Sequence, residues 1–204
     1  MKNISSKKGF TIIEILVAVA ILGLITIVVS SFQVNVIKYN KSAADSLQSA
    51  MDARSILRTM VKELRSMSIG NNGAYPLEEA AISSITFYSD IDSDGLKEKI
   101  HYFSEGTTLK KGVIIPTGSP YTYLSSDEKF QILAYSIKNS EANPLFEYFD
   151  DTYTGTSSPL SFPATISLVK LVKISLLIDA DPNYSPLPRI YTSQVNLRNL
   201  KDNL

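Results

Sequence analysis

One long apolar stretch near the N-terminus dominates the hydrophobic pattern of the chain. Residues 12–29 are almost all aliphatic, and a single carboxylate, Glu14, interrupts them. A stretch of this length can cross the hydrocarbon core of a bilayer, so it predicts a transmembrane helix over residues 10–32. Glu14 lies only about 6 Å along the helix axis from Phe10, close to the interface, where an ionisable group costs less free energy than at the membrane centre.

The helical pattern continues beyond this apolar stretch. Over residues 33–69 apolar side chains recur at steps of three and four, which predicts an amphipathic helix with one buried stripe. The members of that stripe are Leu47, Met51, Ile56, Leu57, Met60, Val61, Leu64 and Met67. The sequence Gly-Asn-Asn-Gly at residues 70–73 favours left-handed caps and turns, and it predicts the end of the helix. A continuous helix over residues 10–69 would be about 90 Å long.

The rest of the chain, residues 70–204, predicts a β-rich globular domain. Short runs of apolar and aromatic residues alternate with turn sequences. The predicted strands cover residues 82–89, 97–104, 107–115, 129–138, 166–178 and 190–197. A turn rich in Asp and Gly at residues 90–95 joins the first two strands as a hairpin. Because one long helix precedes the strands, we expect an α+β fold in which the amphipathic half of the helix covers an antiparallel sheet.

The charges are distributed unevenly. The chain has 204 residues, enough for one span and one globular domain, with 20 basic and 20 acidic side chains. Lys2, Lys7 and Lys8 lie within residues 1–9, which contain no acid, so the chain without this segment carries a net charge of −3. A basic segment ahead of a span keeps the N-terminus in the cytoplasm. No basic face appears, which argues against nucleic-acid binding, and there is no cysteine.

The sequence Lys7-Lys8-Gly9-Phe10, followed by Glu14, resembles the class III signal of type IV pilins and type II secretion pseudopilins. The resemblance implies that residues 1–9 are a leader and that a prepilin peptidase cleaves between Gly9 and Phe10. It also implies N-methylation of Phe10 and a role of Glu14 in assembly. Two alternatives stay open: a secretory signal peptide cleaved near residues 28–31, and a plain signal anchor, which has no use for Gly-Phe followed by Glu.

Shorter motifs further along resemble the J-type minor pseudopilins and W-type minor pilins. They lie at residues 53–65, 90–95, 108–112 and 195–200. This resemblance implies a low-abundance, single-pass subunit of the bacterial inner membrane, with the C-terminal domain outside the cytoplasm. Its expected partners are other pilin subunits, the inner-membrane assembly platform and membrane lipid, and its expected place is near the filament tip. Pilus, secretion and DNA-uptake filaments all fit. The alternative is an uncleaved, membrane-anchored extracytoplasmic binding domain that never polymerises.

An enzymatic site is not expected. The single histidine, His101, lies in a predicted strand, and the chain offers no second histidine and no cysteine to complete a metal or nucleophile site. Residues 70–73 end a helix instead of opening one, so they are not a phosphate-binding loop. We expect His101 to be a partly exposed structural residue.

The acidic turn is the one candidate metal site. Asp90, Asp92 and Asp94 alternate ahead of Gly95, which matches the opening of a calcium loop, where carboxylates bind a hard cation and glycine allows a sharp turn. The twelfth position of such a loop is normally Glu but is His101 here, and Glu98 at the ninth would contribute instead. Ca²⁺ is thus the one candidate cofactor. The alternative is an acidic hairpin turn, with Asp and Gly present for turn geometry.

Overall fold

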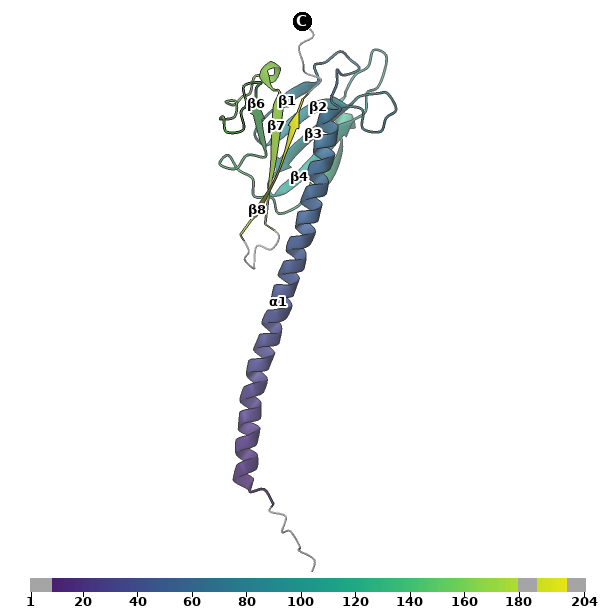
Figure 1. Ribbon diagram of the computed structural model, residues 1–204. Helices are drawn as coiled ribbons and strands as arrows, with labels where there is room; N and C mark the ends of the chain where they lie inside the picture. Colours follow the sequence, from purple (N-terminus) through teal and green to yellow (C-terminus); the bar gives the residue numbers. More distant parts are fainter. Residues whose placement is uncertain (1–8, 180–186, 198–204) are drawn as a thin grey trace, which may run out of the picture. The chain divides into compact units, whose positions relative to one another are not determined.

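The computed structural model describes residues 9–179 and 187–197. The chain divides into two compact units, Met1–Ala44 and Asp45–Leu204, and one helix, α1 (Ile12–Arg65), contributes to both (Figure 1). Residues 1–8 of the expected leader, residues 180–186 before the last predicted strand and the C-terminal residues 198–204 lie outside the described residues.

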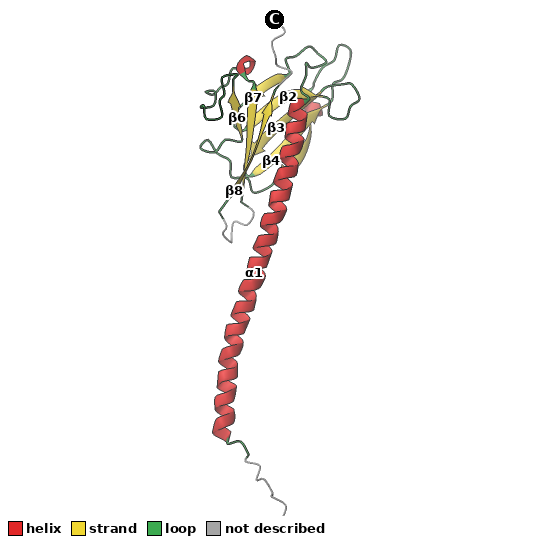
Figure 2. Cartoon of the chain, viewed as in Figure 1, coloured by secondary structure: helices red, strands yellow, loops and turns green. Residues whose placement is uncertain are grey.

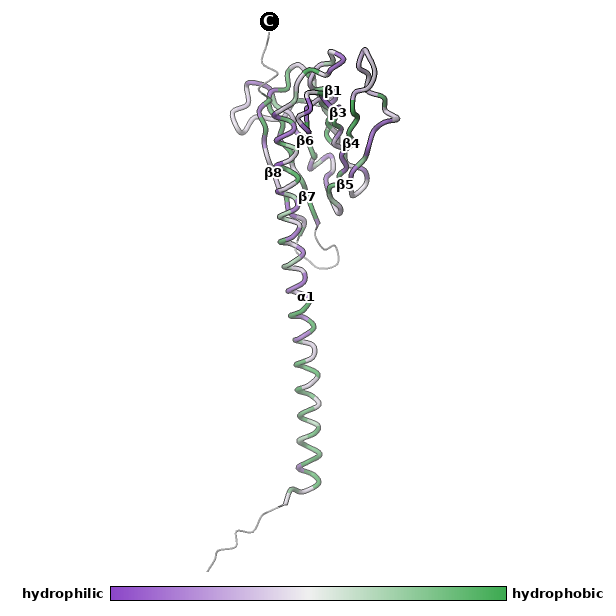
Figure 3. The backbone as a smooth tube through the Cα atoms, turned by 90° about the vertical axis from the view of Figure 1, so that its right-hand side faces the viewer, coloured by the Kyte–Doolittle hydropathy of each residue, from purple (hydrophilic) through white to green (hydrophobic). Residues whose placement is uncertain are grey.

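The described part of the first unit consists of residues 9–44, most of them in the N-terminal part of α1. Nearly all residues of its first turns are apolar (Figure 3), and residues 12–41 are all exposed within the chain. Among the described residues, α1 is the one helix long and apolar enough to cross a membrane. A helix that is apolar all round needs lipid or protein around it, so the observed helix agrees with the predicted span.

The second unit combines the end of α1 with two antiparallel sheets (Figure 2). The first sheet has the strand order β1-β2-β3-β4-β5 and the second the order β6-β7-β8. The strands are β1 (Leu77–Ala80), β2 (Ser84–Ser89), β3 (Glu98–Glu105), β4 (Thr108–Ile114), β5 (Lys129–Ala134), β6 (Phe146–Phe149), β7 (Leu171–Ile178) and β8 (Arg189–Asn196). Two short 3₁₀ helices, η1 (Ser125–Asp127) and η2 (Ile166–Leu168), complete the described elements. The predicted α+β class is confirmed.

One continuous core joins the end of α1 to both sheets. The buried face of α1 begins at Ala53 and continues through Leu57, Met60 and Leu64. The sheet residues of the same cluster include Ile85, Phe87, Ile100, Tyr102, Leu109, Phe146, Tyr148, Val172, Ile174, Leu176 and Val195. Burial of side chains this large supplies most of the favourable free energy of folding, so the second unit has the core of an independent domain.

The predicted buried stripe is wrong at its N-terminal end. Leu47 and Met51 are 65% and 57% exposed, whereas Ser42 and Ser46 are buried. Ser42, Ser46 and Ala53 share one face of α1, and this face is buried instead of the one that carries Leu47 and Met51. Leu47 and Met51 therefore remain on the surface, on a side of the helix that the domain does not cover.

The helix also ends earlier than predicted, at Arg65 rather than residue 69. Ser66 turns its hydroxyl back to the carbonyl oxygens of Lys62 and Glu63. Met67 then forms an antiparallel bridge with Ser89. Pairing with the sheet thus draws the chain out of the helix before the glycine-rich turn at residues 70–73 is reached.

Two strands were not predicted. β1 and β6 have only four residues each, and β1 contains a register shift against β2. Neither segment shows the period-two alternation over five or more residues that marks a strand in a sequence. The predicted strand over residues 166–178 is divided, because its first three residues form η2 and only Leu171–Ile178 pairs as β7.

Candidate functional site

The first candidate site is the start of α1, where Thr11 and Glu14 bind each other. The backbone N–H of Thr11 donates to Glu14 Oε2 at 3.0 Å, and the Thr11 hydroxyl donates to the same oxygen at 3.1 Å. The Glu14 N–H in turn points to Thr11 Oγ1 at 3.4 Å. Since α1 begins at Ile12, Thr11 is the N-cap and Glu14 the third helical residue, and this reciprocal pair is a capping box.

The capping box fixes where the helix begins, and it leaves the predicted cleavage bond outside. Gly9 and Phe10 have no helical conformation, and Phe10 is 84% exposed. Apart from the residues next to it in the chain, no described residue places a heavy atom within 4 Å of the position that a Cβ on Gly9 would occupy. The bond between these two residues is therefore in an open, non-helical segment, a conformation that a peptidase can engage.

The carboxylate of Glu14 is held by its own chain and carries no ion pair among the described residues. Its charge stands at the end of the apolar run with only Thr11 as partner. Thr11 was not singled out from the sequence, although the spacing Thr-x-x-Glu ahead of an apolar run is a known sign of a capping box. Within a single copy, the Glu14 carboxylate accepts hydrogen bonds from Thr11. It has no cationic partner among the described residues, so it can still form an ion pair with a group from another chain.

An exposed, apolar helix without proline that is long enough to cross a membrane is typical of membrane-anchored proteins, and here a non-helical Gly-Phe bond precedes it. Residues 4–30 match the family model described as the prokaryotic N-terminal methylation motif. The match indicates the type IV pilin-like superfamily and supports a substrate of a prepilin peptidase. With the apolar helix, it fits a single-pass protein anchored in the inner membrane. It points to a structural subunit and not to an enzyme family. No curated protein matches the chain.

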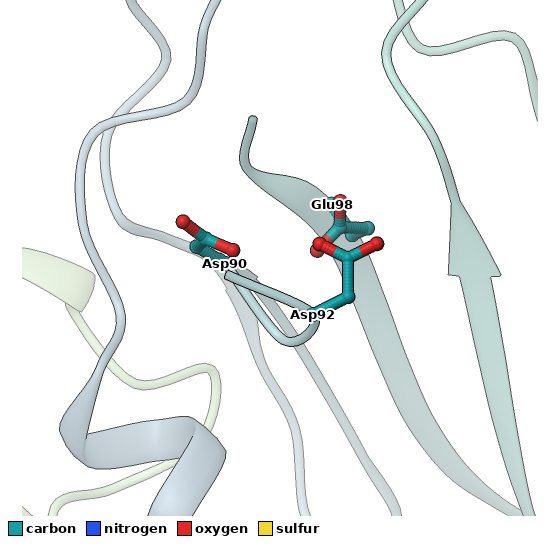
Figure 4. Close-up of side chains that lie close together, drawn as sticks. All are labelled: Asp90, Asp92 and Glu98. Carbon is teal, nitrogen blue, oxygen red and sulfur yellow. The ribbon is translucent and has the colours of Figure 1, made fainter. Parts of the chain in front are cut away.

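The acidic hairpin between β2 and β3 is the second candidate site. Asp90, Asp92 and Glu98 each place a carboxylate oxygen within 4.8 Å of the other two (Figure 4). Asp90 follows β2, Asp92 lies at the hairpin tip and Glu98 begins β3. Three carboxylates that converge in this way can act as oxygen ligands for a hard cation. Asp94, the other predicted ligand, is outside the group and accepts the N–H of Leu96 at 2.7 Å.

The partners of Asp90 show how the loop holds its shape. Asp90 accepts the N–H groups of Ser93 and Gly95 at 2.7 and 3.1 Å and pairs with Lys97 Nζ at 3.2 Å. Burial raises the pKa of Asp90, but the bonds from Lys97, Ser93 and Gly95 outweigh it and hold that pKa below the usual range. Gly95 has φ +92°, a conformation in which any other residue is strained. Turn geometry alone thus explains part of the Asp/Gly pattern.

Turn geometry does not explain why the carboxylate of Glu98 lies beside the acidic turn. Its side chain is almost fully buried, with 2% exposure, and its Oε2 accepts the Ile91 N–H at 3.0 Å. Burial raises the pKa of Glu98 and the charges of Asp92 and Asp94 raise it further, against the opposing effect of the Ile91 bond. A carboxyl group with a raised pKa destabilises the fold progressively as the pH rises through its unfolded-state value. A bound cation would remove that cost.

Residues outside the acidic turn also hold it in place. The backbone N–H of Lys97 donates to Asn71 Oδ1 at 2.6 Å, and the Lys97 carbonyl accepts the hydroxyl of Tyr123 at 2.6 Å. These contacts tie the hairpin to the turn after α1 and to the segment before η1. The sequence gives no sign of them, because the partners lie 26 residues apart in both cases.

His101 is partly exposed and lies in a strand, as the sequence predicted. It lies in β3, half-buried, with Nδ1 3.2 Å from Glu128 Oε1 and its ring stacked on Phe103 at 4.4 Å. The Glu128 side chain passes over Gly112 to reach His101. A Cβ at residue 112 would come within 1.8 Å of Glu128 Oε1. Gly112, in the interior of β4, thus leaves room for this pair.

Calcium binding by the hairpin stays a prediction, and heat denaturation tests it. We expect a Kd on the order of 10⁻⁴–10⁻³ M, as in extracellular calcium modules. For a soluble fragment from about residue 38 onward, a tenfold excess of Ca²⁺ over Kd should stabilise the fold by about 1.4 kcal/mol and raise Tm by about 3–6 °C. Mg²⁺ should do much less, because it demands octahedral geometry and dehydrates reluctantly.

Two variants separate ligands from turn residues. Asp92→Ala should abolish the Ca²⁺-dependent rise in Tm, whereas Asp94→Ala should lower Tm slightly but leave the rise. Identical melting curves in Ca²⁺ and EDTA for the unaltered fragment would mean that the aspartates form only a turn.

Proposed function

We propose that this chain is a subunit of a pilin-type filament, either a type IV pilus or a type II secretion pseudopilus, and that it assembles through α1. The observation that carries the proposal is the methylation motif at residues 4–30, followed by an apolar helix whose side chains the rest of the described chain leaves exposed. Such a helix is stable in lipid before assembly and in a bundle of like helices afterwards.

Processing prepares the N-terminus for assembly. A prepilin peptidase cleaves after Gly9, removes the leader of residues 1–9, and the new amine of Phe10 is methylated. The open conformation of Gly9 and Phe10, outside the capped helix, supports this assignment. Residues 10–32 then anchor the subunit, residues 33–69 link the anchor to the domain, and residues 70–204 form most of that domain.

Glu14 gains its cationic partner on assembly. In the membrane the carboxylate is satisfied by Thr11 within the same copy. In a filament it pairs with the amine of Phe10 on a neighbouring subunit, so two charges that are costly in an apolar medium are removed together. A prepilin-type subunit has its N-terminus in the cytoplasm and its C-terminal domain outside, and its partners are the peptidase, other pilin subunits, the assembly platform and membrane lipid.

Within this class we assign the chain to the minor subunits that begin assembly near the tip. The J- and W-type motifs and the long segments at residues 116–128 and 140–163 support this assignment, although the second segment is not a single loop, because it contains the buried strand β6. The second candidate function is an uncleaved, membrane-anchored binding domain. The open Gly9–Phe10 bond and the methylation motif favour the filament subunit over it.

Abundance tests the minor role. Deleting the gene should reduce the number of filaments or the amount of secreted protein, because fewer assemblies begin. Quantitative proteomics of sheared filaments should find the chain present but far below the main subunit. Equal stoichiometry with the main subunit would refute the initiating role, and absence from filaments that assemble normally would favour the anchored binding domain.

A further inference from the structure

In the second unit, α1 presents two surfaces of opposite charge on opposite sides. The first, which we call the arginine stripe, consists of Leu47, Met51, Arg54, Arg58 and Arg65, all exposed. At 3.6 residues per turn these five lie within about 60° of one another around the helix axis. In the part of the chain that the structure describes, no carboxylate pairs with any of the three arginines.

The second surface is a groove between α1 and the ends of two strands. It has a volume of about 230 Å³ and is lined by Ser49, Asp52 and Ile56 of α1, residues 133–136 at the end of β5, and Ile178 and Asp179 at the end of β7. We call it the acidic groove. Its two charged residues are both aspartates, and neither forms an ion pair with a described residue; Asp52 accepts only the amide of Gln48, at 2.9 Å.

The two surfaces suit each other in chemistry. The acidic groove has an apolar floor, to which the partly buried Ile56, Leu133 and Ala134 contribute. Leu47 and Met51 are the exposed apolar side chains of the arginine stripe, and the arginines flank them toward the C-terminus. Interfaces are enriched in Met and Arg, and opposite charges across an interface set partner choice and register.

We propose that the arginine stripe of one copy of this chain docks in the acidic groove of a second copy. The two surfaces lie roughly 150° apart around α1, so one copy can use both at once, with a different neighbour on each side. When the contact joins two different patches of the same chain, successive copies do not have to close into a ring. Without closure, the copies extend as an open filament. The inference rests on the proposed filament assembly, and a pair or short run of copies at the start of a filament is enough to form it.

Disulfide formation between two copies tests the contact, because the chain has no cysteine of its own. Full-length chains with two different epitope tags are produced together with the assembly machinery, one with Met51→Cys in the stripe and the other with Tyr135→Cys at the groove rim. Tyr135 is 67% exposed. We expect a disulfide-linked dimer carrying both tags. The matched control replaces Met51→Cys by Gln48→Cys, which lies in the same turn of α1 outside the stripe and should give much less dimer.

Charge exchange separates a specific contact from chance collision. Arg54→Glu with Arg58→Glu in the stripe should lower the yield of dimer by about tenfold, the loss expected for two exposed ion pairs. Asp52→Lys with Asp179→Lys in the groove should do the same. The two altered partners combined should restore the yield to within a factor of about two, which excludes misfolding as the cause of the loss.

The possible results distinguish a failure of this inference from a failure of the proposed function. Equal dimer from positions 48 and 51, or no dimer in cells where the chain is cleaved and enters filaments, would overturn the inference and leave the proposed function standing. A chain that is neither cleaved nor incorporated would overturn both. With p-benzoyl-phenylalanine in place of Tyr135, the cross-linked peptide should contain residues 47–58 of a second copy. A peptide from the helix of a different subunit would overturn the choice of a second copy as the occupant.

Discussion

Replacing Glu14 by alanine should leave membrane insertion and cleavage intact but lower incorporation into filaments by about a hundredfold or more. The reason is the amine of Phe10 on the neighbouring subunit, which would lose its partner in an apolar environment. Removing one member of a buried ion pair costs about 3–5 kcal/mol, and each 1.4 kcal/mol is a factor of ten. Incorporation is measured by immunodetection of the chain in sheared filaments, relative to the amount in the membrane.

Two matched variants separate the charge of Glu14 from its role in the capping box. Glu14→Gln keeps a side chain that can cap the helix but removes the charge, so it should fail in assembly as alanine does. Thr11→Val removes the capping hydroxyl but keeps the carboxylate, so it should still be incorporated. Assembly of Glu14→Ala at the level of the unaltered chain would contradict the proposed pairing with Phe10.

The second large effect is expected in the globular domain, where a buried ion pair joins α1 to the sheet. Glu63 of α1 accepts Lys111 Nζ of β4 and the hydroxyl of Tyr102 of β3, both at 2.6 Å. The side chains of Glu63 and Lys111 are each only 10% exposed. Lys111→Met would leave the Glu63 carboxylate buried with Tyr102 as its remaining partner, so we expect a loss of about 3–5 kcal/mol in the free energy of unfolding.

Urea denaturation of the fragment from about residue 38 onward measures this loss. Lys110→Met is the matched control: the neighbouring lysine pairs with Glu105, whose side chain is 66% exposed, and an exposed pair contributes at most about 1 kcal/mol. The double variant Lys111→Met with Glu63→Leu should recover much of the loss, because no unpaired charge remains in the core. Equal losses for Lys110→Met and Lys111→Met would show that the buried pair does not stabilise the domain.

Local pattern explains which parts of the fold the sequence predicts. The long apolar run, the glycine-rich turn at residues 70–73 and the hairpin around residues 90–95 all depend on neighbours in sequence, and each appears in the structure. The division into two sheets depends on pairing between distant strands. The short strands β1 and β6 gain their partners from β2 and β7, so neither has a pattern of its own to detect.

The same distinction holds for the candidate sites. Gly9, Phe10 and Glu14 lie within six residues and form a recognisable motif. In the acidic hairpin, local spacing correctly brings Asp90 and Asp92 together with Glu98, but it does not reveal that Lys97 already neutralises part of the charge. Leu47 and Met51 have the spacing of core residues, and only the three-dimensional packing shows that serines take the buried positions instead.

The intact mass of the chain, extracted from the membrane of cells that contain a prepilin peptidase, tests the central claim most directly. The pilin-type assignment predicts a single product that begins at Phe10 and carries one added methyl group on the N-terminal amine. A mature chain that still contains Met1 or Lys7 would contradict cleavage at Gly9 and favour the anchored binding domain. A chain that begins near Ser31 would show an ordinary secretory signal peptide and contradict the assignment altogether.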